Sequence, residues 1–407
     1  MPGPLSHIRV LDLTRVLAGP WCAQNLADLG AEVIKVERPK KGDDSRAFGP
    51  PWAKDENGKE TTEAGYFLCA NRGKKSITID IASDAGAALV KEIAKTADVF
   101  LENFKVGDLA SKGLGYEDLK KINPKIIYCS ITGFGQTGPY APKPGYDFMI
   151  QGMGGFMSVT GERDHKPGGG PQRAGVPVVD IMTGMYSTIA VCAAIANRER
   201  TGKGQHIDMA LLDTQVGFLA NQGANFLVTG EPPARLGNTH PNIVPYQSVP
   251  TKDGAIILAC GNDNLFSKLC DLLGQPALKT DPRFVTNAAR VANRDALDPI
   301  LDEAMKKRTT AEWVEALEGA GVPCGPINNL KEVFENEQVI ARGLRVEIPH
   351  PTAGKVSLVR SPMRFSETPV EHKVPPPLLG QHTEEVLRDV LGRSTAEIAE
   401  LRKAGTV

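Results

Sequence analysis

A single carboxylate between a loop and an apolar run is the most reactive candidate in this sequence. Asp147 follows Lys143-Pro144-Gly145-Tyr146 and precedes Phe148-Met149-Ile150. A carboxylate in such a place can act as a nucleophile toward an activated acyl group. Asp is also a common N-cap, because its side chain accepts hydrogen bonds from free N–H groups at the start of a helix. The segment alone favours the cap, so the rest of the chain must decide between the two roles.

Cationic residues stand at the ends of several expected strands. Arg15 and Arg38 follow the first two strands, Asn71-Arg72-Gly73-Lys74-Lys75 stands just before another, and Asn103-Phe104-Lys105 follows a further one. Open α/β sheets bind their ligands at the carboxyl ends of strands. Exposed Arg and Lys are ordinary surface residues. A set of this kind nevertheless suits a long ligand that carries several phosphates and a planar base.

Short β-branched runs alternate with amphipathic stretches in the first third of the chain. We expect strands over residues 8–13, 33–36, 76–81, 98–101 and 125–132, and helices over 21–29 and 85–95, with a short helical stretch before Asn123-Pro124. A long helix should run from Asp180 to about Arg200, followed by a strand at 206–209 and another helix. This alternation predicts an α/β fold with a parallel, doubly wound sheet.

The chain is expected to form two domains. A large Rossmann-like α/β domain would be built from both chain ends, residues 1–225 and 331–407, around a smaller α/β domain of residues 226–330. A Gly-, Pro- and Asn-rich linker at 229–242 leads into the smaller domain. Short strands over 344–365 and two terminal helices should complete the large domain.

One glycine motif has the form of a dinucleotide fingerprint. Gly133-Phe134-Gly135-Gln136-Thr137-Gly138 follows an expected strand. A dinucleotide loop must open a helix, whereas Pro139, Pro142 and Pro144 prevent a continuous helix here. We therefore predict a tight glycine turn that leads the chain toward Asp147, and no NAD site.

Composition excludes several classes of function. The chain has 407 residues, of which 41% are hydrophobic and 23% charged, enough for two domains with substantial cores. A formal net charge of −1 provides no basic field for nucleic acid or an anionic membrane. Seven cysteines without a C-x-x-C pattern predict small buried side chains, with neither disulfides nor a metal site. With no signal peptide and no apolar run of spanning length, we expect a cytoplasmic protein with no membrane partner.

A series of motifs covering essentially the entire chain resembles the class III (CaiB/BaiF) coenzyme A transferases. They are Arg15-Val16-Leu17-Ala18-Gly19-Pro20, Ala31-Glu32-Val33-Ile34-Lys35-Val36-Glu37, Asn71-Arg72-Gly73-Lys74-Lys75-Ser76, Glu102-Asn103-Phe104, Thr132-Gly133-Phe134-Gly135, Gly145-Tyr146-Asp147, Thr201-Gly202-Lys203-Gly204-Gln205 and Leu379-Gly380-Gln381-His382-Thr383. Within that family the sequence looks closest to the succinyl-CoA:glutarate CoA-transferase type. The motifs behind this are Arg235-Leu236-Gly237-Asn238-Thr239-His240, Ile243-Val244-Pro245-Tyr246-Gln247 and Gly321-Val322-Pro323 through Gly325-Pro326-Ile327-Asn328-Asn329.

The resemblance implies an enzyme that moves CoA from an acyl-CoA to a free carboxylic acid, with Asp147 as the nucleophile. Asp147 would form a mixed anhydride and then an aspartyl-CoA thioester. CoA would be a substrate rather than a tightly bound cofactor, and the protein would be an intertwined, ring-like homodimer. The implied CoA site comprises Arg15, Val16, Leu17, Arg38, Ala70, Asn71, Arg72, Gly73, Asn103, Phe104, Lys112 and Gly133. For the acceptor pocket we expect Arg46, Asn238, His240 and Tyr246.

Three alternative functions stay open at this point. A formyl-CoA:oxalate-type transferase is disfavoured because Leu17 replaces a Gln of those relatives, Ser111 replaces an Arg near Lys112, and their glycine-rich flap is missing from the compact segment 229–246. An α-methylacyl-CoA racemase needs a histidine at the reacting carbon, and none lies in residues 8–164. A non-catalytic acyl-CoA-binding protein would not need Asp147 and its Gly-Tyr lead-in. These differences favour a dicarboxylate acceptor.

Overall fold

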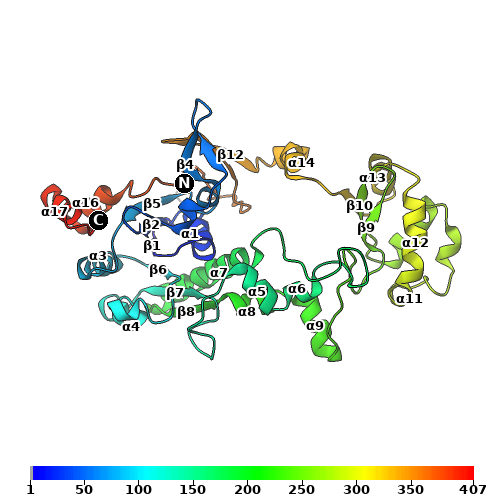
Figure 1. Cartoon of the computed structure of the whole chain (residues 1–407), viewed down its shortest axis with the longest axis horizontal. Helices are drawn as coiled ribbons and strands as arrows, with labels where there is room; N and C mark the ends of the chain where they lie inside the picture. The colour runs from blue at the N-terminus through cyan, green and yellow to red at the C-terminus, as the bar shows by residue number, and fades with distance from the viewer. Residues whose placement is uncertain (1–2) are drawn as a thin grey trace. The chain divides into compact units, whose positions relative to one another are not determined.

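The computed structural model describes residues 3–407 and divides the chain into two compact units. The first unit comprises the described residues up to Gly155, then Ala174–Gly223 and Glu337–Val407 (Figure 1). The second unit comprises Phe156–Arg173 and Ala224–Asn336. The first unit therefore contains both chain ends. Residues 156–173, expected in the large domain, belong to the second unit.

A six-stranded sheet with the order β5-β2-β1-β6-β7-β8 forms the centre of the first unit. Every neighbouring pair in it is parallel. The expectation of an α/β fold with a large parallel sheet is confirmed. The strand order reverses between β1 and β6, which is where sheets of this kind form a ligand crevice. The strands are β1 (Arg9–Asp12), β2 (Glu32–Glu37), β5 (Lys74–Thr78), β6 (Val99–Glu102), β7 (Ile127–Thr132) and β8 (His206–Ala210).

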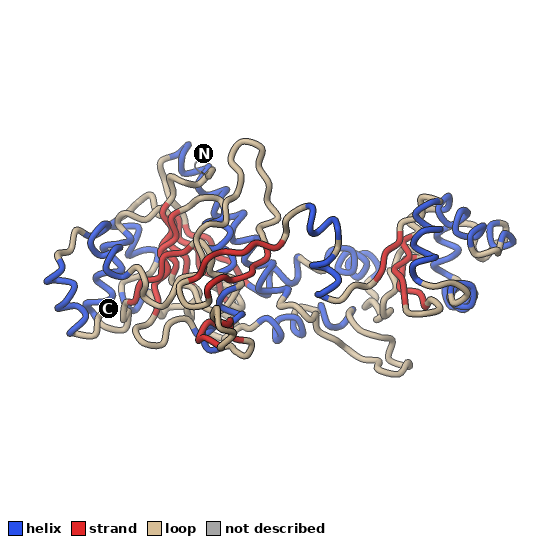
Figure 2. The backbone as a smooth tube through the Cα atoms, turned by 90° about the horizontal axis from the view of Figure 1, so that it is seen from above, coloured by secondary structure: helices blue, strands red, loops and turns tan. Residues whose placement is uncertain are grey.

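Helices cover both faces of this sheet, because alternate side chains of each central strand point to opposite faces. Val10 and Val33 face a core shared with helices α1 and α7, whereas Leu11 and Ile34 face a core shared with α3, α16 and α17. Figure 2 shows the strands between helices. The helices of this unit are α1 (Ala18–Asp28), α3 (Asp84–Ala94), α4 (Tyr116–Ile122), α5 (Asp147–Met153), α7 (Val178–Thr201), α8 (Leu211–Gly217), α16 (Thr383–Leu391) and α17 (Thr395–Lys403).

Smaller elements of the first unit lie outside the sheet. The chain after β2 forms a 3₁₀ turn, a hairpin and a short helix that the sequence analysis did not anticipate. The strands expected at 344–365 form a hairpin. These elements are η1 (Asp44–Ala47), β3 (Trp52–Lys54), β4 (Glu60–Ala64), α2 (Gly65–Leu68), η2 (Ala110–Lys112), α15 (Glu337–Ala341), β12 (Arg345–His350) and β13 (Gly354–Val359).

The second unit has its own apolar core around a three-stranded antiparallel sheet of order β11-β10-β9. Trp313 is fully buried in this core, and its indole N–H donates to the carbonyl of Met305. Its elements are α6 (Phe156–Val159), β9 (Tyr246–Pro250), β10 (Ala255–Ala259), α10 (Asp263–Leu272), η3 (Pro276–Lys279), α11 (Asn287–Ala292), α12 (Arg294–Met305), α13 (Thr310–Gly319), β11 (Cys324–Pro326) and α14 (Leu330–Glu335). Helix α9 (Ala220–Thr229) spans the boundary between the units.

Helix α7 is long and apolar enough to cross a membrane by length and composition alone, contrary to the expectation that no apolar run reaches spanning length. Core helices of globular proteins pass the same test. Val191, Ala194 and Ile195 of α7 are buried against the sheet. Its apolar character is therefore accounted for in part by the core of the first unit.

The seven cysteines are all free, and Cys22, Cys129, Cys260 and Cys270 are buried as expected for small apolar side chains. Cys69 is exposed instead. Burial raises the pKa of Cys22 and Cys260 to about 12 and that of Cys270 to about 11. Within residues 3–407, no group of His, Cys, Asp or Glu side chains is arranged to hold a metal ion.

Candidate active site

Two cavities open at the carboxyl ends of the parallel strands, and both lie entirely within the first unit. Cavity A, of about 300 Å³, follows β1, β6 and β7; it includes Val16, Leu17, Gly133, Tyr146 and Asp180 in its lining. Cavity B, of about 460 Å³, follows β1, β2, β5 and β6. Arg15, Phe104 and Asp108 line both cavities. The sheet thus places its cavities at the edge that the sequence analysis expected.

Cavity B is rich in charged side chains. Its lining includes Arg15, Arg38 and Lys112. Asp44 at the start of η1 pairs with both arginines; its Oδ2 lies 3.2 Å from Arg15 Nη1. The Arg15 guanidinium also lies 5.0 Å from the centre of the Phe104 ring. Cations beside an aromatic ring suit phosphates next to a planar base.

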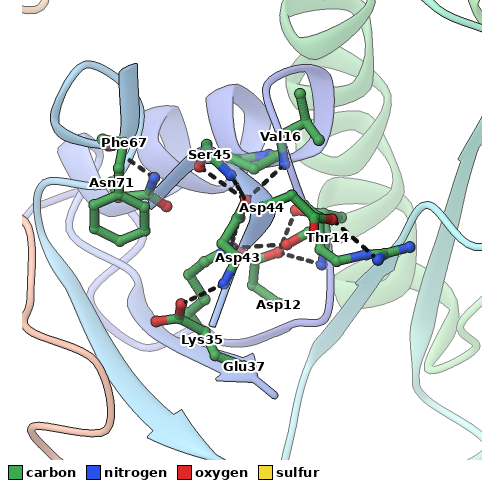
Figure 3. Close-up of polar contacts among 12 residues, drawn as sticks. Asp12, Thr14, Val16, Lys35, Glu37, Asp43, Asp44, Ser45, Phe67 and Asn71 are labelled. Carbon is green, nitrogen blue, oxygen red and sulfur yellow. Dashed lines mark hydrogen bonds and ion pairs between the residues drawn. The ribbon is translucent and has the colours of Figure 1, made fainter. Parts of the chain in front are cut away.

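Side chains from β1, β2 and the η1 turn form a buried polar cluster beneath the start of α1 (Figure 3). Lys35 and Asp43 form an ion pair at 2.8 Å, with side chains 0% and 1% exposed. Burial opposes ionisation of Asp43, but the Lys35 ammonium lowers the pKa of this carboxyl. The same carboxylate accepts the backbone N–H of Val16 at 3.1 Å.

Two glycines explain how the chain reaches cavity A after β7. A Cβ on Gly133 would lie 2.5 Å from the Cα of Gly145, and a Cβ on Gly145 would lie 2.2 Å from the Cα of Gly133. The two backbones therefore pass at a distance that only glycine allows. This contact closes the proline-containing loop and sets Tyr146 and Asp147 beside the end of β7. Gly133 of the glycine motif thus provides the close contact between the two backbone segments.

Asp147 lies at the first residue of α5, half-buried, and its carboxylate is occupied by hydrogen bonds. Oδ1 accepts from Gln151 Nε2 at 2.6 Å, and Oδ2 accepts from the backbone N–H groups of Val179 at 2.8 Å and Asp180 at 3.2 Å. Those two N–H groups belong to the first turn of α7, where no intrahelical acceptor exists. Asp147 thus serves as a cap, although for α7 rather than for α5. In the described part of the chain it is not among the residues that line cavity A.

Asp180 in the first turn of α7 presents the carboxyl that does line cavity A. Burial and the negative charge of Asp147 raise the pKa of Asp180 to about 7. Burial, with the charges of Asp180 and Asp147, raises the pKa of nearby Tyr66 to about 12. The sequence analysis did not single out Asp180, because an acid in the first turn of a helix is normally a favourable partner of the helix dipole.

Four residues expected at the CoA site are set apart from both cavities. Ala70, Asn71, Arg72 and Gly73 precede β5, and they line neither cavity. Asn71 is fully buried and bonds the carbonyl of Phe67. Arg72 is 6% exposed, and its guanidinium pairs with Asp28, with Nη2 2.5 Å from Oδ2. Residues before a parallel strand lie at the amino edge of the sheet, opposite its cavities, which is the physical reason for the difference.

The residues expected at the acceptor pocket divide between the units. Arg46 lies in the first unit, where its guanidinium binds Glu37 through two hydrogen bonds of 2.7 Å and lies over the ring of Phe67. Asn238, His240 and Tyr246 lie in the second unit, where residues 238–240 run beside β9. The rings of His240 and Tyr246 are 5.3 Å apart. Burial and the charge of Arg294 lower the pKa of His240.

Comparison with known proteins gives concordant results. The model for "CoA-transferase family III" matches residues 5–383. A succinate–glutarate CoA-transferase of Agrobacterium fabrum is 52% identical over 387 residues, covering 95% of this chain and 96% of that protein. A succinyl-CoA:glutarate CoA-transferase of Homo sapiens is 46% identical over 99% of this chain and 90% of its own length. The crystal structure of a CAIB/BAIF family protein from Brucella suis has a TM-score of 0.84 at 49% identity and covers 96% of this chain and 100% of that one.

Proposed function

The chain belongs to CoA-transferase family III, and on this premise we propose that it transfers CoA from succinyl-CoA to glutarate or a closely similar dicarboxylic acid. The enzyme class follows from the family. The choice of donor and acceptor is supported by relatives of 46% and 52% identity that carry those names. Exchange of one thioester for another has a small overall free energy change, so the protein's task is to lower barriers.

The transfer proceeds through two aspartyl intermediates. An aspartate oxygen attacks the thioester carbonyl and expels CoA thiolate, which leaves a mixed anhydride. The thiolate then attacks the aspartyl carbonyl of the anhydride, which gives an aspartyl-CoA thioester and releases the first acid. The incoming carboxylate attacks this thioester, the thiolate leaves again, and its attack on the new acyl group forms the product and restores the aspartate. Exclusion of water protects the anhydride from hydrolysis.

We assign the nucleophile to Asp180 rather than to Asp147, the residue that the sequence favoured. The observation that supports Asp180 is its place in the lining of cavity A beside Val16 and Leu17. The carboxylate oxygens of Asp147 instead accept hydrogen bonds from Gln151 and from the first turn of α7. A carboxylate bound in this way is poorly placed to attack, whereas the raised pKa of Asp180 makes its carboxylate a basic attacking group.

CoA itself would extend from cavity A into cavity B. The pantetheine thioester would reach Asp180 along Val16 and Leu17, and the phosphates would meet Arg15, Arg38 and Lys112 in cavity B. Asp44 already pairs with both arginines, so binding of phosphates would compete for these ion pairs. Free cysteines and the absence of disulfides among the described residues suit a reducing compartment such as the cytoplasm.

A homodimer is the assembly we propose. Three helices of the first unit that pack against one another, α5, α7 and α8, expose large apolar side chains: Met149, Met153, Met185, Tyr186, Ile189 and Val216. Exposed apolar side chains gathered on packed helices are typical of an interaction site. A second copy of the chain is the partner that the family resemblance implies, and covering this face would bury the exposed side of α7.

Trapping the intermediate tests the nucleophile. Wild type, Asp180→Asn and Asp147→Asn would each be incubated with succinyl-CoA, treated with borohydride or hydroxylamine, digested and analysed by mass spectrometry. We expect a modified residue at position 180 in wild type and in Asp147→Asn, and none in Asp180→Asn. A modification at position 147 would return the nucleophilic role to that residue. Formation of glutaryl-CoA in the presence of glutarate, compared with oxalate and malonate, tests the acceptor.

A further inference from the structure

Side chains from other parts of the first unit bind successive backbone groups ahead of helix α1. Thr14 N–H donates to Asp12 Oδ1 at 2.9 Å, and the Thr14 carbonyl accepts from Lys35 Nζ at 2.7 Å. The side-chain amide of Asn103 makes two hydrogen bonds to the backbone of Arg15. Its Oδ1 accepts from Arg15 N–H at 3.0 Å, and its Nδ2 donates to the Arg15 carbonyl at 2.8 Å.

Val16, the next residue, is held by the buried ion pair shown in Figure 3. Asp43 Oδ1 accepts Val16 N–H, while Asp43 Oδ2 pairs with Lys35. A hydrogen bond to an ionised carboxylate is roughly twice as strong as one between neutral groups. Lys35 therefore stabilises the segment in two ways. It donates a hydrogen bond to the Thr14 carbonyl, and its charge keeps Asp43 ionised as the acceptor of Val16 N–H.

The support coincides with an unfavourable backbone conformation. Val16 has a φ of 71°, in the left-handed region. A β-branched residue there is a steric outlier, because its Cβ substituents crowd the adjacent carbonyl. Such conformations persist only where the surrounding structure enforces them. The hydrogen bonds to Arg15 come from Asn103, which follows β6, and the bond to Val16 comes from Asp43, which precedes η1. Two separate segments therefore enforce the conformation of Val16.

We propose that Asn103, Lys35 and Asp43 are positioning residues that hold Val16 in its left-handed conformation and so preform the wall of cavity A against which the acyl-CoA thioester reacts. The inference rests on the proposed function, because Val16 and Leu17 line the cavity assigned to the thioester. It also gives Asn103 a role other than binding CoA, since both polar atoms of its side chain are used by Arg15.

A glycine at position 16 distinguishes a positioning role of Asn103 from direct contact between Asn103 and CoA. Asn103→Ala removes both bonds to Arg15 without leaving a buried charge, and we expect it to raise KM for succinyl-CoA about tenfold. Glycine adopts positive φ without a steric cost, so Val16→Gly in the Asn103→Ala background should recover most of that loss. Val16→Ala in the same background shortens the side chain but keeps a Cβ, so it should recover little. If Asn103 touched CoA directly, neither substitution at position 16 would restore KM, and that result would overturn the proposal.

Amide hydrogen exchange gives a readout that needs no substrate. In the wild-type protein the N–H groups of Arg15 and Val16 should exchange slowly, and in Asn103→Ala about tenfold faster. In the double variant with Val16→Gly, the N–H of residue 16 keeps its acceptor Asp43 and should exchange more slowly again, whereas the Arg15 N–H has lost Asn103 and should stay fast. Unchanged exchange in Asn103→Ala would contradict the proposal. If the exchange rates behave as expected but wild type forms no glutaryl-CoA, the proposed reaction is wrong while the positioning role stands. Thermal unfolding of each variant verifies that the fold is kept.

Discussion

The charge state of Asp180 sets the pH dependence that we expect of the reaction. Its pKa is raised to about 7 by burial and by the charge of Asp147. Only the carboxylate form attacks, so the active fraction grows as the pH rises through that value. For a single group, kcat/KM for succinyl-CoA should increase about tenfold between roughly pH 6 and pH 8. A rate profile that is flat over this interval would argue against Asp180 as the nucleophile.

Replacing Asp147 should shift the pH dependence of kcat/KM without abolishing CoA transfer. Asp147→Asn removes a negative charge that raises the pKa of Asp180, so the rising limb should shift to lower pH. The variant also weakens the cap of α7, for which we expect a loss of about 0.5–2 kcal/mol in the free energy of unfolding. Asp84→Asn, in the first turn of α3, is a matched control that should leave the limb in place. Complete loss of transfer in Asp147→Asn, with the fold intact, would favour the nucleophilic role for Asp147.

Individual site residues were predictable where the sequence showed which strand they follow. Arg15, Asn103 and Gly133 come after strands and line cavity A. Residues 70–73 come before β5 and line neither cavity. They were predicted at the site because residues at either end of a strand were considered. Asp180 was not predicted because the pattern around it indicates only a helix. The hydrogen bond from its N–H to Asp147 depends on two segments 33 residues apart.

The connection between β7 and α5 depends on the close contact of Gly133 with Gly145. Gly133→Ala would place a Cβ 2.5 Å from the Cα of Gly145, and backbone on both sides leaves no flexible side chain to give way. We expect a loss of about 1–3 kcal/mol in the free energy of unfolding together with lower activity, because Asp147 and α7 would be displaced. Chemical denaturation and the glutaryl-CoA assay measure the two effects.

Gly217→Ala provides the control for that experiment. Gly217 lies at the end of α8, and an added Cβ meets nothing within 4 Å. Alanine is the better helix former by about 0.5–1 kcal/mol, so this variant should be as stable as wild type or slightly more stable. Equal loss in Gly133→Ala and Gly217→Ala would show that the cost comes from losing glycine flexibility and not from the backbone crossing.

Arg72 joins separate elements of the first unit. Its guanidinium pairs with Asp28 at the end of α1 and donates to the carbonyl of Val359 in β13. Arg72→Met should lower the free energy of unfolding by about 3 kcal/mol, because it removes the guanidinium from the buried Asp28 carboxylate and leaves His372, at 3.5 Å, as its remaining partner. KM for succinyl-CoA should stay near the wild-type value. A large increase in KM without loss of stability would restore Arg72 to the CoA site, where the sequence had placed it.

At the scale of the whole molecule, the parallel sheet was predictable because its signals are local. Alternating β-branched and amphipathic runs predicted six elements close to their observed bounds, namely β1, α1, β2, α3, β6 and β7. The association of residues 156–173 with the second unit was not predictable, since it depends on contacts with residues far along the chain. One such contact is the 2.9 Å pair between Arg163 and Asp295.

The exposed face of α7 should control assembly. Ile189 is 62% exposed on this helix. Ile189→Glu would place a charge in the proposed dimer interface, so we expect sedimentation to show a shift from dimer to monomer at micromolar concentration. Ile122→Glu, at the end of α4 and 41% exposed, serves as the control and should leave the dimer intact. A wild-type protein that sediments as a compact monomer would contradict the dimer directly.

The placement of the cysteines has a consequence for an enzyme that handles activated acyl groups. Thioesters and anhydrides acylate any thiolate within reach, and a thiolate near the reacting centre would divert the acyl group into a dead-end adduct. No cysteine is among the described residues that line cavity A or cavity B. Burial raises the pKa of the six thiols other than that of the exposed Cys69. We therefore expect no cysteine to be acylated during turnover, so that the carboxylate in cavity A is the protein group that receives the acyl group.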